Sequence, residues 1–338
     1  MDERYSRQIL FRPVGELGQQ HIQNATVGII GCGALGTAIA ETLTRAGIGE
    51  LHVVDRDYVE FSNLQRQQLF TEQDAVDMIP KVIAAEKRLK AIRTDIKLVT
   101  YLQNADGVLL EQLAKKCDLL LDATDNFETR LLINDAAHKH HIPWIYGACV
   151  GSSGVVFPFV PEASACFRCL LPALPALNQT CDTVGILAPA VQTTAALQAM
   201  EALKWLIGNH QNMRNKVHYF DLWDSTSMDI GISRLRRAEC ETCGNHPTYS
   251  ALQESSQEPA VLCGRNAVQI MPDSNRPLTL DHAEQAASKL KTRSKRTPYF
   301  VELYAFERRI IVFADGRLLI HGAKTAAEGK KVYHQLFG

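Results

Sequence analysis

The segment from residue 26 to residue 55 constrains the fold of this chain more than any other. Its apolar run at residues 27–30 predicts a short buried strand, and a G-x-G-x-x-G pattern follows at Gly31, Gly33 and Gly36. In such a pattern the glycines provide a tight turn, close approach of the backbone to a phosphate, and close packing of a helix on a strand. Exposed N–H groups and the positive end of the next helix favour an anion there.

A helix and a second strand complete this unit. Leu35, Ile39, Leu43 and Ala46 recur at helical spacing, which predicts one apolar helix face against a sheet. The run 51–54 predicts the next strand, and Asp55 at its end is placed to hydrogen-bond the hydroxyl groups of a ribose. A glycine triplet alone is a weak signal, but strand, helix, strand and acid in register indicate a nucleotide-binding βαβ unit.

Strand-like and helix-like segments continue to alternate up to residue 147. We expect strands at 96–101, 118–122 and 142–147, with helices at 108–115 and 128–140 between them. This alternation predicts an α/β fold with a Rossmann-like, doubly wound, mostly parallel sheet. A further helix is expected at 190–207, followed by paired strands at 217–220 and 227–232. That helix is expected to carry its apolar side chains on one side: Leu197, Met200, Leu203 and Leu206.

Polar residues follow several of these predicted strands. Asp125 and Asn126 come after the strand 118–122, so they belong on the same edge of the sheet as Gly31 and Asp55, although one of them could serve only as a helix cap. Past Asp55 the chain is irregular and polar, with four apolar anchors expected: Phe61, Leu64, Leu69 and Phe70.

Lys81 begins a predicted helix after a proline. A cation at the positive end of a helix does not stabilise that helix, so an anionic ligand explains it better.

Composition and charge exclude several classes of protein. The net charge of −1 gives no reason to expect binding to nucleic acid or to an anionic membrane. No apolar run is long enough for a membrane span, and the first residues do not resemble a signal peptide. The nine cysteines are an odd number without secretory context, which favours a cytoplasmic protein with free thiols and metal ligands.

Two C-x-x-C pairs predict a metal site. Cys166 with Cys169, and Cys240 with Cys243, can together supply the four thiolates of a structural Zn²⁺ site, which would pin the irregular Pro- and Cys-rich loop after residue 158. A redox role would need only one pair and would leave the other unexplained. Four thiolates leave no open position on the metal, so we expect an architectural role.

The other cysteines divide into three groups. Cys32, Cys117 and Cys149 are expected to be small core residues. Cys263 has no evident partner. Cys181 lies in a polar loop, where an inert and a reactive thiol remain equally open interpretations.

These motifs, taken in order, resemble the ThiF/MoeB family, bacterial relatives of the ubiquitin-activating enzymes. The resemblance covers residues 1–247. It rests on RYSRQ at 4–8, GCGALG at 31–36, VVDRDYVEFSNLQRQ at 53–67, PK at 80–81, LDATDN at 121–126, both C-x-x-C pairs, and CDTVGILAPAV at 181–191. A nicotinamide-dependent dehydrogenase would share only the glycine pattern and Asp55.

The resemblance implies ATP-dependent adenylation of the C-terminal glycine of a small ubiquitin-like sulfur-carrier protein ending in Gly-Gly, for thiamine thiazole or molybdopterin synthesis. It implies that the glycine pattern and Asp55 bind ATP, and that Asp125, beside Asn126, holds Mg²⁺. It places Asn63, Arg66 and Lys81 on the phosphates.

Two further roles also come from the resemblance alone. Arg7, which by itself suggests a solvated surface cation, corresponds to an arginine that reaches the nucleotide of a neighbouring subunit, so a homodimer is implied. Cys181 corresponds to a cysteine that, in thiazole-pathway members, forms a covalent link to the activated carrier.

Two alternatives remain at this point. One is a family relative that adenylates a peptide or an RNA-borne carboxylate. The other is a nucleotide-binding protein without catalysis, against which the joint presence of Arg7, Arg66, Lys81 and Asp125 argues.

The rest of the chain lies outside the resemblance. We expect an adenylating domain at 1–247, a linker at 248–260, and a small α+β domain of unknown role at 261–338, with strands at 267–271, 299–304, 308–314 and 318–321 and helices at 280–290 and 323–336. No sulfurtransferase loop is visible, so the sulfur donor is expected to be another protein. A basic run near residue 293 is either a solvated helix end or a dock for an acidic partner: Lys289, Lys291, Arg293, Lys295 and Arg296.

Overall fold

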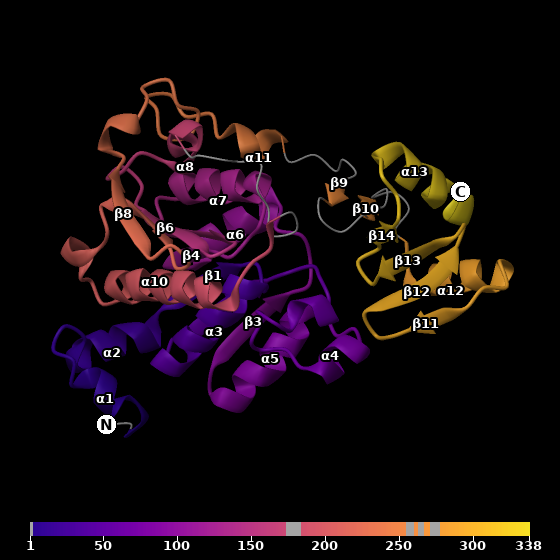
Figure 1. Cartoon of the computed structure of the whole chain (residues 1–338), viewed down its shortest axis with the longest axis horizontal. Coiled ribbons are helices and arrows are strands. Elements are labelled where there is room, and N and C mark those ends of the chain that lie inside the picture. Colours follow the sequence, from indigo (N-terminus) through magenta and orange to yellow (C-terminus); the bar gives the residue numbers. More distant parts are fainter. Residues whose placement is uncertain (1–2, 174–183, 255–259, 263–266, 271–277) are drawn as a thin grey trace. The chain divides into compact units, whose positions relative to one another are not determined.

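A computed structural model describes residues 3–173, 184–254, 260–262, 267–270 and 278–338 (Figure 1). The chain divides into two compact units, Met1–Ser255 and Ser256–Gly338. Helix α11 (Ser250–Glu254) falls inside the stretch 248–260 that we expected to be a linker. The three domain ranges given above stay a prediction.

The first unit is built on one mixed sheet, which has eight strands in the part of the chain that the structure describes. The strands are β1 (Thr26–Ile30), β2 (Glu50–Val54), β3 (Lys97–Tyr101), β4 (Leu119–Asp122), β5 (Trp144–Val150), β6 (Ser153–Phe159), β7 (Lys216–Asp221) and β8 (Thr226–Gly231). Their order is β3-β2-β1-β4-β5-β6-β7-β8. Strands β1 to β5 pair in parallel, and β6 to β8 continue the sheet antiparallel.

Helices cover both faces of this sheet, as the doubly wound prediction requires (Figure 1). They are α1 (Ser6–Ile9), α2 (Gly15–Asn24), α3 (Ala34–Ala46), α4 (Glu72–Val76), α5 (Lys81–Ile92), α6 (Gly107–Lys116), α7 (Phe127–Lys139), α8 (Phe167–Leu170) and α10 (Ala188–Leu206), with α11. One core lies between the sheet and α3, α5 and α10. The other lies between the sheet and α6, α7 and α8.

Alternation along the strands explains the two cores. Val27 and Ile29 of β1 belong to the first core, while Ile30 belongs to the second, because successive strand residues point to opposite faces. All four residues expected on the inner face of α3 are buried, which confirms that part of the prediction: Leu35, Ile39, Leu43 and Ala46.

Two packing predictions were wrong. Met200 of α10 is 51% exposed, because the fully buried face of this helix carries small and polar side chains such as Val191, Ala195 and Gln198. Phe61 is 60% exposed and does not anchor the segment after β2, whereas Leu69 and Phe70 do. In both cases apolar spacing identified the element but not the side that faces the core.

In its described residues, the second unit is an antiparallel sheet with two helices on it. Its strand order is β11-β12-β13-β14-β10-β9. The strands are β9 (Ala260–Leu262), β10 (Ala267–Ile270), β11 (Ser294–Arg296), β12 (Phe300–Ala305), β13 (Arg308–Phe313) and β14 (Leu318–His321), and the helices are α12 (Leu280–Lys289) and α13 (Ala326–Phe337). Val268, Val301, Ile310 and Ile320 form its core with Ala283 of α12. The expected hairpin and both helices are confirmed, and β9 and β11 are additional.

The sheet order locates the candidate site of the first unit. The order reverses between β1 and β4, and ligands of open α/β sheets bind outside the carboxyl ends of the strands at such a point. Ile30 is in register with Val54 on one side and with Asp122 on the other. The three segments that follow β1, β2 and β4 therefore leave the sheet side by side.

Candidate functional site

The glycine loop, residues 31–36, packs against the loop that follows β4. Gly31 has a φ of +101°, and a Cβ there would lie 2.4 Å from the carbonyl oxygen of Ala123. A Cβ on Gly36 would lie 2.0 Å from the carbonyl oxygen of Gly31. Neither position tolerates a side chain, so both glycines fix the turn and the close approach that the sequence predicted.

Gly33 has a different surrounding. Within 4 Å of a Cβ placed there, the structure describes only Gln67 Nε2, at 3.7 Å. Gly33 is also the N-cap of α3 and makes no side-chain capping hydrogen bond. The backbone beside Gly33 and the first N–H groups of α3 can therefore receive an anion.

Asp55 closes the glycine loop. Its Oδ2 accepts a hydrogen bond from the N–H of Cys32 at 2.7 Å, and its Oδ1 accepts one from the N–H of Asp57 at 2.7 Å. A carboxylate has further acceptor capacity, so these bonds orient Asp55 without preventing it from binding hydroxyl groups. Burial raises the pKa of the Cys32 thiol, which agrees with its predicted role as a small core residue.

Lys81 lies beside this loop, and Arg66 precedes Gln67, whose Nε2 is 3.7 Å from a Cβ placed on Gly33. Lys81 is the first residue of α5 and is 3% exposed, and its Nζ lies 3.5 Å from Asp57 Oδ2. The carbonyl oxygen of Lys81 accepts a long contact of 3.9 Å from Cys32 Sγ, which places it next to the glycine loop. Arg66 is half-buried, and its Nη1 donates to the carbonyl oxygen of Ser62 at 2.9 Å.

No carboxylate among the described residues pairs with Arg66. Buried or half-buried cations with so few partners are suited to anionic groups of a ligand.

Asn63 and Gln67 complete this side of the site. Asn63 is buried, and its Oδ1 accepts the N–H of Glu60 at 3.1 Å. Gln67 is 4% exposed and its Oε1 has no hydrogen-bond partner in the described part of the chain. The sequence places Gln67 with Asn63 and Arg66 in the polar segment just beyond Asp55, but it assigns Gln67 no role; its position beside Gly33 comes from the fold.

The loop after β4, residues 122–126, brings the predicted acidic residues to the same edge. Asn126 caps α7, because its Oδ1 accepts the N–H of Thr129 at 2.8 Å. The Asp125 carboxylate is exposed and makes no hydrogen bond or ion pair with the described residues. Capping, which the sequence allowed for either residue, thus belongs to Asn126 and leaves Asp125 available to a ligand.

A buried ion pair holds this loop. Arg130 Nε lies 2.9 Å from Asp122 Oδ2, and Arg130 Nη2 donates to the carbonyl oxygen of Thr124 at 2.7 Å. Asp122 Oδ1 accepts the hydroxyl and the N–H of Thr124 at 2.6 and 2.9 Å. Burial raises the pKa of Asp122, and Arg130 and Thr124 oppose that rise.

Arg7 lies away from the glycine loop of its own chain. It is exposed in α1 and pairs with no described residue. Its neighbour Gln8 donates from Nε2 to the carbonyl oxygen of Ala46 at 2.9 Å, at the C-terminal end of α3, whereas the glycine loop is at the other end of that helix. The structure therefore does not bring Arg7 together with the other predicted site residues.

The four-cysteine knuckle, formed by Cys166, Cys169, Cys240 and Cys243, is assembled as predicted. All four cysteines are buried, and their sulfur atoms lie within 4.8 Å of one another. Cys166 and Cys240 are 3.5 Å apart at sulfur, and Cys169 and Cys243 are 3.6 Å apart. Sulfurs around a tetrahedral Zn²⁺ at about 2.3 Å would be separated by roughly 3.8 Å, so the donor set and its spacing fit a zinc ion.

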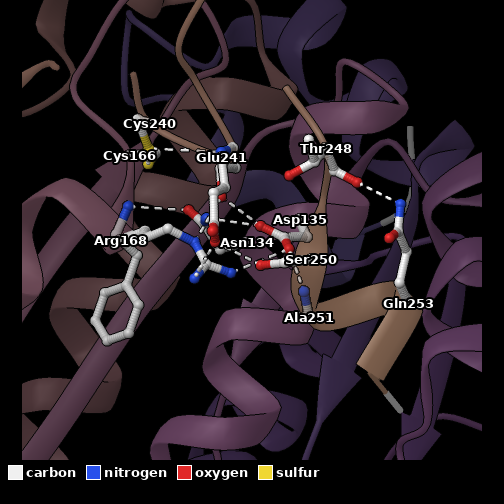
Figure 2. Close-up of polar contacts among 12 residues, drawn as sticks. Asn134, Asp135, Cys166, Arg168, Cys240, Glu241, Thr248, Ser250, Ala251 and Gln253 are labelled. Carbon is white, nitrogen blue, oxygen red and sulfur yellow. Dashed lines mark hydrogen bonds and ion pairs between the residues drawn. The ribbon is translucent and has the colours of Figure 1, made fainter. Parts of the chain in front are cut away.

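A polar clamp on α7 fastens both halves of the knuckle (Figure 2). Asp135 is buried and accepts hydrogen bonds from the hydroxyl of Thr242, and from the N–H of Ala251 at 3.0 Å. Arg168 Nη2 lies 3.3 Å from the same carboxylate, and Arg168 Nη1 lies 2.9 Å from Glu241. Arg168 and Thr242 each stand inside one C-x-x-C pair, so Asp135 joins the two pairs. Nothing local in the sequence distinguishes Asp135 from a surface acid, so its role could not be predicted.

The remaining cysteines have separate outcomes. Cys117 is buried, and burial raises its pKa to about 12, which confirms a core role. Cys149 is half-buried. Cys181 and Cys263 lie outside the described residues, so the proposed reactivity of Cys181 stays a prediction.

In the described part of the chain, no helix combines the length and apolar character needed to span a membrane.

Comparisons with known proteins agree with this geometry. A sulfur carrier protein ThiS adenylyltransferase of Bacillus subtilis (strain 168) is 42% identical over 338 residues, which is 100% of this chain and 100% of that protein. A protein of the same description from Escherichia coli (strain K12) is 38% identical over 243 residues, 71% of this chain and 94% of its own length. The crystal structure of E. coli MccB with ATP has a TM-score of 0.62 at 24% identity, over 72% of this chain and 75% of that one, which shows a shared fold.

The model of the ThiF family matches residues 5–242, a range that contains the glycine loop, the loop after β4 and the four-cysteine knuckle. This chain therefore belongs to the ThiF family.

Proposed function

We propose that this protein adenylates the C-terminal glycine of a ThiS-like sulfur-carrier protein, using ATP and releasing pyrophosphate. The observation that carries the proposal is the 42% identity to a ThiS adenylyltransferase over the whole of both chains. Because the match covers 100% of this chain, it includes the second unit as well as the first. Between the two carrier pathways considered from the sequence, it favours the carrier for thiamine thiazole synthesis.

The proposed reaction needs little covalent chemistry from the protein. An oxygen of the carrier's terminal carboxylate attacks the α-phosphorus of ATP, and the bond from that phosphorus to the bridging oxygen breaks. Pyrophosphate leaves with the electron pair, and the carrier becomes an acyl-adenylate. Two polyanions must meet, so positioning and neutralisation of charge supply most of the acceleration.

The site residues fit these requirements. We propose that the backbone from Gly31 to Gly36 and the N-terminus of α3 receive phosphate, as the open surrounding of Gly33 supports. Asp55 binds the ribose, and Asn63, Arg66 and Lys81 face the phosphates. The exposed carboxylate of Asp125, beside Asn126, would hold Mg²⁺, which would neutralise part of the phosphate charge.

We further propose that the four-cysteine knuckle holds zinc. The fit of four buried sulfurs to a tetrahedral site supports it. All four positions are filled by protein, so its role is to fix the chain between β6 and α11 and not to bind substrate.

A homodimer is part of the proposal. Gln8 is attached to the C-terminal end of α3, and 13 residues of helix separate that end from the glycine loop, a distance of about 20 Å. An arginine side chain at position 7 cannot span it, so Arg7 would serve the nucleotide of a second copy. Leu10, Phe11 and Leu17 nearby are 71%, 61% and 65% exposed, which suits an interface.

The edge strand β8 offers a surface for the carrier. All its residues are exposed, and among the described strands it pairs with β7 alone. Trp223, Met228 and Ile230 on this hairpin are 79%, 51% and 45% exposed. Unpaired strand-edge groups beside apolar side chains are the features that bind a protein partner.

For Cys181, the proposal rests on the family resemblance alone. We propose that its thiolate attacks the acyl carbon of the carrier's acyl-adenylate, so that a thioester forms and AMP leaves, and that adenylation itself does not need Cys181.

The decisive experiment is pyrophosphate–ATP exchange with purified ThiS-like and MoaD-like carriers in parallel. We expect exchange that depends on the ThiS-like carrier and on its terminal glycine. Exchange with only the MoaD-like carrier would assign the protein to molybdopterin synthesis instead of thiamine thiazole synthesis. Exchange with neither carrier, but with a peptide carboxylate, would refute the carrier assignment.

A further inference from the structure

Helix α7 connects the two sites of the first unit. Its N-cap, Asn126, ends the loop that carries Asp125, and its third turn carries Asn134 and Asp135 beside the four-cysteine knuckle. About nine residues of helix, roughly 13 Å, separate these ends. A helix of this length is stiff, so a displacement at one end moves the other.

The knuckle is fixed to α7 by polar bonds from both of its halves. The N–H of Phe167 donates to Asn134 Oδ1 at 2.9 Å. The Asp135 carboxylate accepts a hydrogen bond from the Thr242 hydroxyl of one C-x-x-C pair. Arg168 of the other pair lies 3.3 Å from the same carboxylate (Figure 2). When the cysteines are held together, these bonds set the position of the third turn of α7.

Phe167, between Cys166 and Arg168, also packs against the first turn of α7. It is fully buried and stacks on Phe127 with ring centroids 6.3 Å apart at 15°. It also contacts Tyr146, with centroids 5.1 Å apart. The Arg130 guanidinium lies over the rings of the same two residues, at 5.4 and 5.2 Å. Phe167 thus packs behind the two rings on which this cation rests.

Arg130 in turn holds the backbone next to Asp125. Its guanidinium binds Asp122 and the carbonyl oxygen of Thr124, the residue that precedes Asp125. Asp125 has no bond of its own to the described residues, so Thr124 and the helix cap at Asn126 determine where its carboxylate lies.

We propose that Phe167 and Arg130 are positioning residues, which transmit the metal-held shape of the four-cysteine knuckle to Asp125. The inference rests on the proposed function, because it takes Asp125 as a residue that serves ATP. An error of about 1 Å in such a group lowers activity by about 100-fold. The knuckle therefore contributes to nucleotide affinity as well as to stability.

The experiment compares Phe167→Ala and Phe167→Leu with Phe300→Ala. Phe300 is the matched control, because it is fully buried in the second unit, where its ring packs on Phe313 at 6.2 Å, and no ring contact joins it to Phe127 or Tyr146 in the described chain. For each variant, zinc content, melting temperature, and the dissociation constant of a non-hydrolysable ATP analogue are measured. Binding is measured by calorimetry, with and without Mg²⁺.

We expect Phe167→Ala to keep its zinc and to bind the analogue with Mg²⁺ about tenfold more weakly, with a smaller loss for Phe167→Leu. Without Mg²⁺ the difference from wild type should shrink, because the displaced group is the one assigned to the ion. Phe300→Ala should match wild-type affinity within about twofold despite a lower melting temperature. A purely structural role would lower the melting temperature of both alanine variants and leave both affinities unchanged, which would overturn the inference.

Phe127→Leu provides a second variant in case Phe167→Ala loses zinc or does not fold. Phe127 is half-buried and stands between Phe167 and Arg130, so the change is mild. We expect the same Mg²⁺-dependent loss, and wild-type affinity in a zinc-loaded Phe127→Leu would refute the inference. If the wild-type protein itself does not bind the analogue, the proposed function fails and not merely this extension of it.

Discussion

Replacing Lys81 by Met should stabilise the unliganded protein while it weakens ATP binding. The Lys81 side chain is 4% exposed, and its Nζ reaches Asp57 Oδ2 only at 3.5 Å. Keeping an ammonium group out of water is costly unless its partners are close and numerous. A methionine of similar length would fill the space without that cost, and the Asp57 side chain, which is 20% exposed, stays in contact with water.

The two effects differ in sign and can be estimated. Replacement of poorly compensated buried charges by apolar side chains stabilises proteins by about 1–4 kcal/mol. For one long ion pair we expect the lower part of that range, about 1–2 kcal/mol, which raises the melting temperature by about 2–6 °C. Loss of a charge-assisted bond to phosphate costs about 1.5–3 kcal/mol, so ATP should bind about 10- to 100-fold more weakly.

Differential scanning calorimetry without ligand and isothermal titration calorimetry with ATP measure both quantities. Lys87→Met is the matched control, because Lys87 lies on the same helix but is exposed. We expect no change in its ATP affinity and little change in its melting temperature. A lower melting temperature for unliganded Lys81→Met would refute the reasoning, since Lys81 would then be held for its ion pair with Asp57.

Other consequences can be tested separately. Asp125→Ala should lower the rate of pyrophosphate exchange by about 100-fold or more with an unchanged melting temperature, and an unchanged exchange rate would remove Asp125 from the site. Trp223→Ala should raise KM for the carrier and leave KM for ATP unaltered. A KM for the carrier equal to that of the wild type would exclude the β8 hairpin as the docking surface. Burial lowers the pKa of His138 to about 4, so the unfolded chain, with an ordinary histidine pKa of 6.5, takes up its proton first as the pH falls. Unfolding free energy should therefore drop by up to about 3 kcal/mol between pH 6.5 and pH 4, and His138→Leu should abolish that share of the drop in denaturant titrations. Mass spectrometry of enzyme, carrier and ATP should detect a covalent adduct that Cys181→Ala removes without loss of exchange, and its absence in the wild type would exclude the sulfur-transfer role.

The nucleotide-binding half of the molecule could be predicted because steric rules leave a local signature. Gly31 needs a positive φ and Gly36 needs the space of its missing Cβ, so the residue type itself records the geometry. Asp55 follows a strand whose register with β1 decides where it lies. The C-x-x-C spacing also records local geometry, because one helical turn presents two sulfurs to one ion.

Contacts between distant segments left no such signature. Asp135 accepts a hydrogen bond from the N–H of Ala251, which is 116 residues away. The Arg130 guanidinium lies over aromatic rings from two different elements. The place of Gln67 in the site follows from its proximity to Gly33. The exposure of Met200 follows from which side of α10 packs on the sheet. Periodicity predicts that a helix has a buried side, but tertiary packing decides which residues form it.

The wide separation of the four cysteines along the chain restricts the order in which the protein can fold. Cys166 and Cys240 are 74 residues apart, and closing a flexible loop of that length costs roughly 4 kcal/mol of chain entropy. Antiparallel pairing of β6 with β7 shortens that loop before any metal binds. We therefore expect zinc uptake during refolding to follow formation of the sheet, which stopped-flow circular dichroism with a zinc-sensitive dye would resolve. During synthesis, likewise, the metal site cannot close until residue 243 has left the ribosome, so the adenylating unit completes its fold from its C-terminal end.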